Sequence, residues 1–208
     1  AEETWIQDPI DRLAIELMGV YNKEKVVVYN TYQLYRSDRL SFLKISHKIA
    51  AEGNFILGAK LVRGAYMEKE RARAAAKNYE DPIQKNKNAS DEAYDAALDY
   101  CVANIADISI CAGTHNENSS MHLVNLMAQH GIASNDRRVY FSQLLGMSDN
   151  LSYNLSEAGY NVAKYVPYGP VKKVLPYLFR RAEENTAIAG QMGRELSLIV
   201  AEQNRRKG

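Results

Sequence analysis

The chain has 208 residues, and 46% of them are hydrophobic, which is enough to form one globular unit with a sizeable core. Lysine and arginine total 26 against 25 acidic residues, and the resulting net charge of +1 disfavours nucleic-acid binding and electrostatic attraction to an anionic membrane. No apolar run approaches the ~20 residues that cross a bilayer, and residues 1–7 lack the pattern of a secretory signal. The sequence therefore predicts an intracellular protein with at most peripheral membrane contact.

The opening segment has the spacing of an amphipathic helix, because Ile6, Ile10, Leu13, Leu17 and Val20 recur at helical intervals. After it come five short segments rich in β-branched and aromatic residues, as is typical of buried strands. These predicted strands are residues 26–33, 55–66, 107–115, 139–147 and 161–169.

Helical patterns lie between the predicted strands. Residues 36–51 place Leu40, Leu43, His47 and Ala50 on one face, and residues 117–130 do the same with Met121, Val124, Leu126 and Met127. Residues 78–88 are polar and irregular, which predicts a surface loop between two helical pieces. Residues 171–202 form a closing helical region with Leu175, Leu178 and Ala182 in register, and we expect Pro176 to divide it.

The alternation of strands and helices predicts an α/β fold with parallel strands, either a doubly wound sheet or a (β/α)₈ TIM-like barrel. Neither the G-x-G-x-x-G nor the G-x-x-x-x-G-K-[ST] phosphate-binding motif is present, which favours the barrel. Each predicted strand also ends in polar residues or glycine, as expected at the active face of a barrel. A closed barrel needs eight strands, so residues 1–208 are predicted to form a single partial barrel domain that supplies about the last five βα units.

Residues 60–66 are the most informative stretch. A period of two places Lys60, Val62, Gly64 and Tyr66 on one strand face and Arg63 on the other. A buried ammonium at Lys60 would need an anion or a polarised ligand atom, and Gly64 would leave room for a flat ligand. The alternatives are that Lys60 extends its charged end to solvent at the strand start and that Arg63 forms an ion pair with the outer helices.

Two further groups could bind anionic parts of a ligand. Residues 114–116 (Thr114, His115, Asn116) supply polar groups at the mouth of a strand, just before a helix N-terminus that favours phosphate; the alternative is helix capping by Thr114 or Asn116. The adjacent Arg180 and Arg181 could clamp a carboxylate, whereas the alternative is a surface salt bridge with Glu184.

The two cysteines and four histidines do not point to a metal or a disulfide framework. Cys101 and Cys111 lie in apolar segments without a Cys-x-x-Cys pair, so a reducing compartment is expected. No histidine has a second ligand at metal spacing, and we therefore expect no metal site.

Taken together, these motifs resemble proline dehydrogenase, the flavin-dependent family that oxidises L-proline to Δ1-pyrroline-5-carboxylate in the first step of proline catabolism. The resemblance covers nearly the whole chain. The motifs that carry it are residues 29–33, 60–66, 114–117, 143–147, 164–170 and 177–185.

The resemblance implies roles for individual residues around FAD and L-proline, with the flavin acting as the electron sink. The positions of Arg180 and Arg181 grip the substrate carboxylate in that family. The residues that shape the pocket around the proline ring are Tyr66, Leu144, Tyr165 and Tyr177. The flavin-facing positions are Gln33, Lys60, Val62 and Glu184, with Thr114, His115 and Asn116 along the rest of the cofactor; some family members have Arg in place of Lys60.

The resemblance also implies partners. Family members have strands ahead of the segment that starts at Ala1, including a substrate-contacting Lys and an Asp that would immediately precede Ala1. We therefore expect a missing N-terminal barrel half or a partner chain to complete the barrel. A quinone is the expected electron acceptor, and the expected location is the cytoplasm or the inner-membrane surface in bacteria and the mitochondrion in eukaryotes.

Two other interpretations stay open from the sequence. In the first, the chain is a lyase or aldolase-type barrel in which Lys60 forms a Schiff base with a carbonyl substrate. In the second, it is an inactive half barrel that needs a partner segment.

Overall fold

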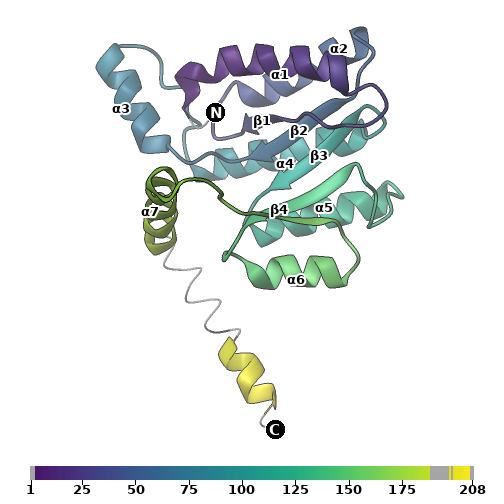
Figure 1. Ribbon diagram of the computed structural model, residues 1–208, viewed down its shortest axis with the longest axis vertical. Helices are drawn as coiled ribbons and strands as arrows, with labels where there is room; N and C mark the ends of the chain where they lie inside the picture. Colours follow the sequence, from purple (N-terminus) through teal and green to yellow (C-terminus); the bar gives the residue numbers. More distant parts are fainter. Residues whose placement is uncertain (1–2, 188–196, 198, 207–208) are drawn as a thin grey trace.

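A computed structural model describes residues 3–187, 197 and 199–206, with the backbone alone for residues 180–187. Its centre is one parallel sheet with the strand order β1-β2-β3-β4-β5 (Figure 1). The strands are β1 (Asn30–Gln33), β2 (Leu57–Val62), β3 (Ile108–Gly113), β4 (Val139–Leu144) and β5 (Val162–Tyr165). Each lies inside a predicted strand segment, so the five predicted strands are confirmed, with shorter bounds.

The helices are η1 (Thr4–Ile6), α1 (Gln7–Tyr21), α2 (Arg39–Glu52), α3 (Met67–Lys77), α4 (Lys87–Ala103), α5 (Glu117–Gln129), α6 (Asp149–Glu157) and α7 (Val171–Ala187). Helix α2 packs on β1 and β2, α4 on β2 and β3, and α6 on β4 and β5, all on the same side of the sheet (Figure 1). Sequential strand order with crossovers on one side is the arrangement of a (β/α) barrel, because a doubly wound sheet reverses its order and covers both faces.

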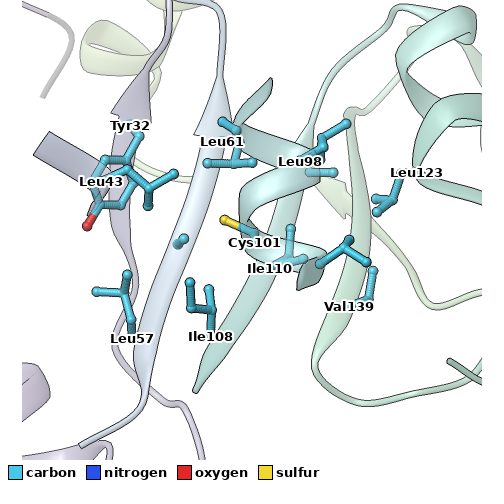
Figure 2. Packing of buried hydrophobic residues seen from close by; sticks show 14 of the residues in the cluster. Tyr32, Leu43, Leu57, Leu61, Leu98, Cys101, Ile108, Ile110, Leu123 and Val139 are labelled. Atoms are coloured by element: carbon cyan, nitrogen blue, oxygen red, sulfur yellow. The ribbon is translucent and has the colours of Figure 1, made fainter. Parts of the chain in front are cut away.

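The hydrophobic core lies between this side of the sheet and the helices (Figure 2). Leu57 and Leu61 of β2, Ile108 and Ile110 of β3 and Val139 of β4 point towards the helices and are fully buried. They pack against Leu43 of α2, Leu98 and Cys101 of α4 and Leu123 of α5. Alternation along each strand then places the remaining side chains on the opposite face, away from these helices.

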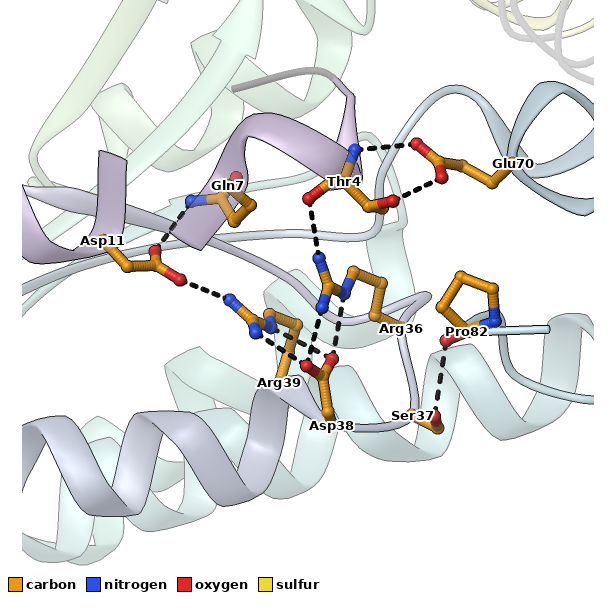
Figure 3. Close-up of polar contacts among 9 residues, drawn as sticks. All are labelled: Thr4, Gln7, Asp11, Arg36, Ser37, Asp38, Arg39, Glu70 and Pro82. Carbon is orange, nitrogen blue, oxygen red and sulfur yellow. Dashed lines mark hydrogen bonds and ion pairs between the residues drawn. The ribbon is translucent and has the colours of Figure 1, made fainter. Parts of the chain in front are cut away.

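Helix α1 lies with its apolar stripe outward, contrary to the usual orientation of an amphipathic helix. Leu13, Leu17 and Val20 are exposed, whereas Asp11 and Met18 are buried. The reason is polar, since Asp11 forms a buried salt bridge with Arg39 of α2 (Figure 3). Asp11 also accepts a hydrogen bond from Asn30 of β1.

Four other details differ from the predicted helices. Met121 of α5 is 58% exposed, although it was placed on the buried side. Pro176 lies inside α7 and does not divide it, so the carbonyl of Lys172 loses its usual helical partner. Leu175 and Leu178 of α7 are exposed, although an inward-facing register was expected. Helix α6 was not predicted.

The predicted loop between two helices is confirmed, and it is anchored to the segment that follows β1. Residues 78–86 connect α3 to α4, and Ile83 within them is buried and forms an isolated β-bridge with Arg36. This bridge explains why α2 begins at Arg39 and not at Arg36, as the spacing had indicated.

Candidate functional site

The face of the sheet opposite α2, α4 and α6 carries the candidate site, and we call it the open face. Strand pairing sets Gln33 beside Val62, Lys60 beside Cys111, and Leu144 beside Tyr165, so these residues share one face. The residues of the open face near the strand ends are Gln33, Lys60, Val62, Cys111, Gly113, Ser142, Leu144 and Tyr165. Apart from the buried Gln33 and the exposed Tyr165, they are half-buried, as expected of a surface that a ligand could cover.

Lys60 lies on this face beside the ring of Tyr165, which in turn contacts the ring of Tyr177. Its Nζ is 5.8 Å from the ring centroid of Tyr165, and the rings of Tyr165 and Tyr177 are 5.9 Å apart in an edge-on arrangement. The structure therefore brings Lys60 of β2 together with residues of β5 and α7 that follow it by more than 100 positions in the sequence. A cation beside an aromatic ring on a half-buried surface can bind a flat, electron-rich ligand.

Two small residues of β3 complete the surroundings of Lys60, and sequence reasoning missed both. Burial raises the pKa of the Cys111 thiol, although the charge of Lys60 opposes this effect. A Cβ on Gly113 would lie 2.9 Å from Cγ1 of Val62 and 3.7 Å from Cε of Lys60, so the glycine makes room for both side chains. The period of two within residues 107–115 could have placed Cys111 and Gly113 on the open face.

The predicted alternation holds as far as Arg63 and fails at Gly64, just after β2 ends at Val62. Gly64 has a φ of +115°, and a Cβ there would lie 2.4 Å from Cδ1 of Tyr35. The ring of Tyr35 thus fills the space that was expected to admit a flat ligand, and that expectation is wrong. Tyr66 does not continue the strand either, because it is the N-cap residue of α3 and its ring lies 4.9 Å from Nζ of Lys69.

The polar residues of the loop after β3 form hydrogen bonds within the protein. Asn116 caps α5 by accepting a hydrogen bond from the backbone N–H of Ser119 at 3.2 Å, which confirms the capping alternative for that residue. Thr114 is buried, and its hydroxyl accepts a hydrogen bond from the backbone N–H of Asn116 at 3.0 Å. His115 Nδ1 lies 3.0 Å from the hydroxyl of Ser148, which links the ends of β3 and β4.

Arg63 lies on the helix side of β2 and is held by contacts on every side. It forms an ion pair with Asp91 of α4, and its guanidinium lies 4.3 Å from the ring centroid of Tyr94. It also donates hydrogen bonds to the hydroxyls of Thr114 and Ser119, both at 2.9 Å. The predicted ion pair with the outer helices is confirmed, and Arg63 connects the loop after β3 to α4.

Replacing Arg63 with methionine should therefore lower the free energy of unfolding by about 2–3 kcal/mol, because three polar partners lose a charged donor. Denaturation with urea would measure the loss. Lys87→Met is a matched control, since Lys87 pairs with the same Asp91 but is exposed, and it should cost less than ~1 kcal/mol. Equal losses for the two variants would contradict this account of Arg63.

Three predicted site residues fall on α7 beyond the described side chains. Arg180, Arg181 and Glu184 belong to the helix by their backbone, but their side chains lie outside the described part of the structure. The same helix supplies the half-buried Tyr177, so its first half reaches the open face.

Metal-binding clusters and membrane-spanning helices are both absent from the described residues. Among them, no group of three or more His, Cys, Asp or Glu side chains could hold a metal ion. Within the same residues, every helix is too short or too polar to span a membrane.

Comparison with known proteins gives a consistent result. The family profile "Proline dehydrogenase" matches residues 1–194. Human mitochondrial proline dehydrogenase 1 is 43% identical over 209 residues, which cover 99% of this chain and 35% of the human protein. Hydroxyproline dehydrogenase of Xenopus laevis is 39% identical over 210 residues, which cover 99% of this chain and 45% of that protein. The chain therefore spans less than half the length of these relatives.

A solved structure matches the fold. Proline utilization A (PutA) from Bdellovibrio bacteriovorus aligns with a TM-score of 0.82 at 24% identity, covering 89% of this chain and 19% of PutA. Proline dehydrogenase domains of PutA form a TIM-like barrel, and the five-stranded parallel sheet described above corresponds to part of it. The predicted fold class is confirmed.

Proposed function

Because the chain belongs to the proline dehydrogenase family, we propose that it forms part of a (β/α)₈ barrel that binds FAD and oxidises L-proline to Δ1-pyrroline-5-carboxylate. The observation that carries this proposal is the convergence of Lys60, Tyr165 and Tyr177 on the open face. Since the chain spans 35% of its human relative, we assign the complete activity to a longer protein or assembly that supplies the other strands.

The open face fits a flat cofactor. It is half-buried, and Gly113 lets the side chains of Val62 and Lys60 lie close against β3, because a Cβ there would be 2.9 Å from Cγ1 of Val62. In this proposal Gln33, Lys60 and Val62 hold the flavin ring, and Thr114, His115, Asn116 and Glu184 hold the remainder of FAD. When bound, FAD supplies the acceptor for a hydride equivalent taken from the carbon next to the ring nitrogen of proline.

The substrate side of the proposal rests on α7 and the strand ends. Two adjacent guanidinium groups at Arg180 and Arg181 can bind both oxygens of a carboxylate, which fixes the orientation of the proline ring. Tyr66, Leu144, Tyr165 and Tyr177 form the wall around that ring in this proposal. Their apolar surfaces exclude water, so the protein contributes by binding, orienting and desolvating the substrate.

Partners and location extend the proposal. We infer that a barrel segment outside these 208 residues, or a partner chain, covers the edge strands β1 and β5. A quinone then accepts the electrons after the flavin. Several eukaryotic relatives carry the word mitochondrial in their names, and we propose a mitochondrial location if the host is a eukaryote and a cytoplasmic or inner-membrane-surface location if it is a bacterium.

An absorption spectrum tests the function directly. The complete barrel should be yellow, and L-proline should bleach the flavin band. Trans-4-hydroxyproline should be tested in parallel, because one relative is a hydroxyproline dehydrogenase. A colourless protein would contradict the cofactor, and borohydride trapping of a keto substrate on Lys60 would favour the Schiff-base interpretation.

Arg181→Met should raise the apparent Kd for proline at least ~10-fold while the flavin stays bound, because a charge-assisted contact is lost. Titration of the flavin absorbance with proline measures this effect. Arg137→Met is the matched control, because Arg137 is exposed in the loop before β4, and proline affinity should not change. Unchanged affinity in Arg181→Met would remove the carboxylate clamp from the proposal.

A further inference from the structure

We propose that Glu3, Thr4 and Trp5 form a clasp with Lys69, Glu70 and Arg73 of α3, and that this clasp positions Tyr66. The inference rests on the proposed function only in taking Tyr66 as a wall of the substrate pocket. Lys69 is then a positioning residue that acts through the Tyr66 ring, and the clasp itself stands on contacts independent of any ligand.

The polar half of the clasp joins the N-terminal segment to the buried side of α3. The backbone N–H of Thr4 donates to Oε1 of Glu70 at 2.8 Å, and the Thr4 hydroxyl donates to the other carboxylate oxygen. Glu70 is fully buried, so its carboxylate depends on these donors for the hydrogen bonds that it loses from water. Nζ of Lys69 lies 3.0 Å from Oε1 of Glu3 on the exposed side.

The aromatic half places one lysine between two rings. Nζ of Lys69 is 5.4 Å from the ring centroid of Trp5 and 4.9 Å from that of Tyr66. The guanidinium of Arg73, one turn further along α3, lies 4.1 Å from the same Trp5 ring. Cation–π attraction from Lys69 and Arg73 therefore links the Trp5 ring to α3, and Lys69 also attracts the Tyr66 ring.

Outside the clasp, helix α3 is held mainly by Arg71, which pairs with Asp81 and donates to the carbonyl of Gln84 at 3.0 Å. Within the helix only Glu70 and Ala74 are buried, and Figure 1 shows α3 standing apart from the helices that cover the sheet. Hydrophobic packing accordingly contributes less to its position than the clasp does. Because Tyr66 is the N-cap residue of α3, any shift of the helix also moves the backbone of Tyr66.

Lys69→Met in the complete holoenzyme tests the clasp, with Lys77→Met as the matched control at an exposed site of the same helix. Trp5 is the only tryptophan of the chain, so its emission reports on the clasp directly where the rest of the protein has tryptophan replaced by phenylalanine. We expect Trp5 emission to move to longer wavelength and α3 amides to exchange about fivefold faster in Lys69→Met. Lys69→Arg should restore both properties, and Lys77→Met should change neither.

A double-mutant cycle tests the link to Tyr66. Lys69→Met should weaken proline binding by about two- to fivefold and leave flavin affinity unchanged, and this effect should vanish in a Tyr66→Ala background. The same loss in both backgrounds would overturn the positioning role, and unchanged emission and exchange would overturn the clasp. If the unmutated holoenzyme failed to bind proline, the proposed function would be contradicted, while emission and exchange would still decide the clasp.

Discussion

Asp11→Ala is expected to lower the free energy of unfolding by about 3–5 kcal/mol, because it breaks a buried salt bridge. Oδ2 of Asp11 lies 2.7 Å from Nη1 of Arg39, and both side chains are 5% exposed. Oδ1 accepts a hydrogen bond from Gln7 at 2.7 Å (Figure 3) and another from Asn30 at 2.7 Å. Alanine leaves two buried amides without this acceptor and Arg39 with Asp38 as its remaining carboxylate partner. Urea denaturation measures the loss.

Asp8→Ala is the matched control on the same helix. Asp8 is exposed in the first turn of α1, where its favourable interaction with the helix dipole is worth less than ~1 kcal/mol. A loss for Asp11→Ala as small as that for Asp8→Ala would show that the buried network does not hold α1 against β1 and α2.

Asp38 extends this network towards η1 and α3. Desolvation opposes ionisation of its carboxyl group, but hydrogen bonds from Arg39 and Arg36 and their charges outweigh it and hold the pKa at about 2. Arg36 in turn donates to the carbonyl of Thr4 at 3.4 Å, so one chain of polar contacts runs from α2 to the clasp on α3 (Figure 3).

This network explains why the orientation of α1 could not be predicted from the sequence. Hydrophobic periodicity assigns the apolar stripe to the core, and it holds for α2, where Leu43 and Ala50 are buried. In α1 two of the three partners of Asp11 lie far along the chain, on β1 and α2. A helical pattern alone does not contain such pairings, so the buried face could not be identified.

The candidate site was predictable as far as strand periodicity extends. Lys60 and Val62 share the open face and Arg63 points to the helices, as the period of two requires. The barrel class was predictable too, because parallel strands with polar ends leave few arrangements. The period of two could not predict where Gly64 and Tyr66 lie, because no residue preference in the sequence indicates that β2 ends at Val62.

Gly64→Ala should be the other strongly destabilising change, with an expected loss of about 2–5 kcal/mol in the free energy of unfolding. One part of the loss comes from the backbone, because a φ of +115° is strained for any residue with a side chain. The other part comes from the Tyr35 ring, which would lie 2.4 Å from the new Cβ and is 3% exposed, so it has little room to move.

Two further variants separate the two parts. Gly146→Ala also places a side chain at positive φ, here +75°, but nothing lies within 4 Å of its Cβ, so it should cost only about 1–2 kcal/mol. In Gly64→Ala/Tyr35→Leu the ring clash is removed, so the double variant should be at least ~1 kcal/mol more stable than the sum of the single losses predicts. Strict additivity in urea denaturation would assign the whole cost to the backbone, and Tyr35 would then have no part in requiring glycine at the end of β2.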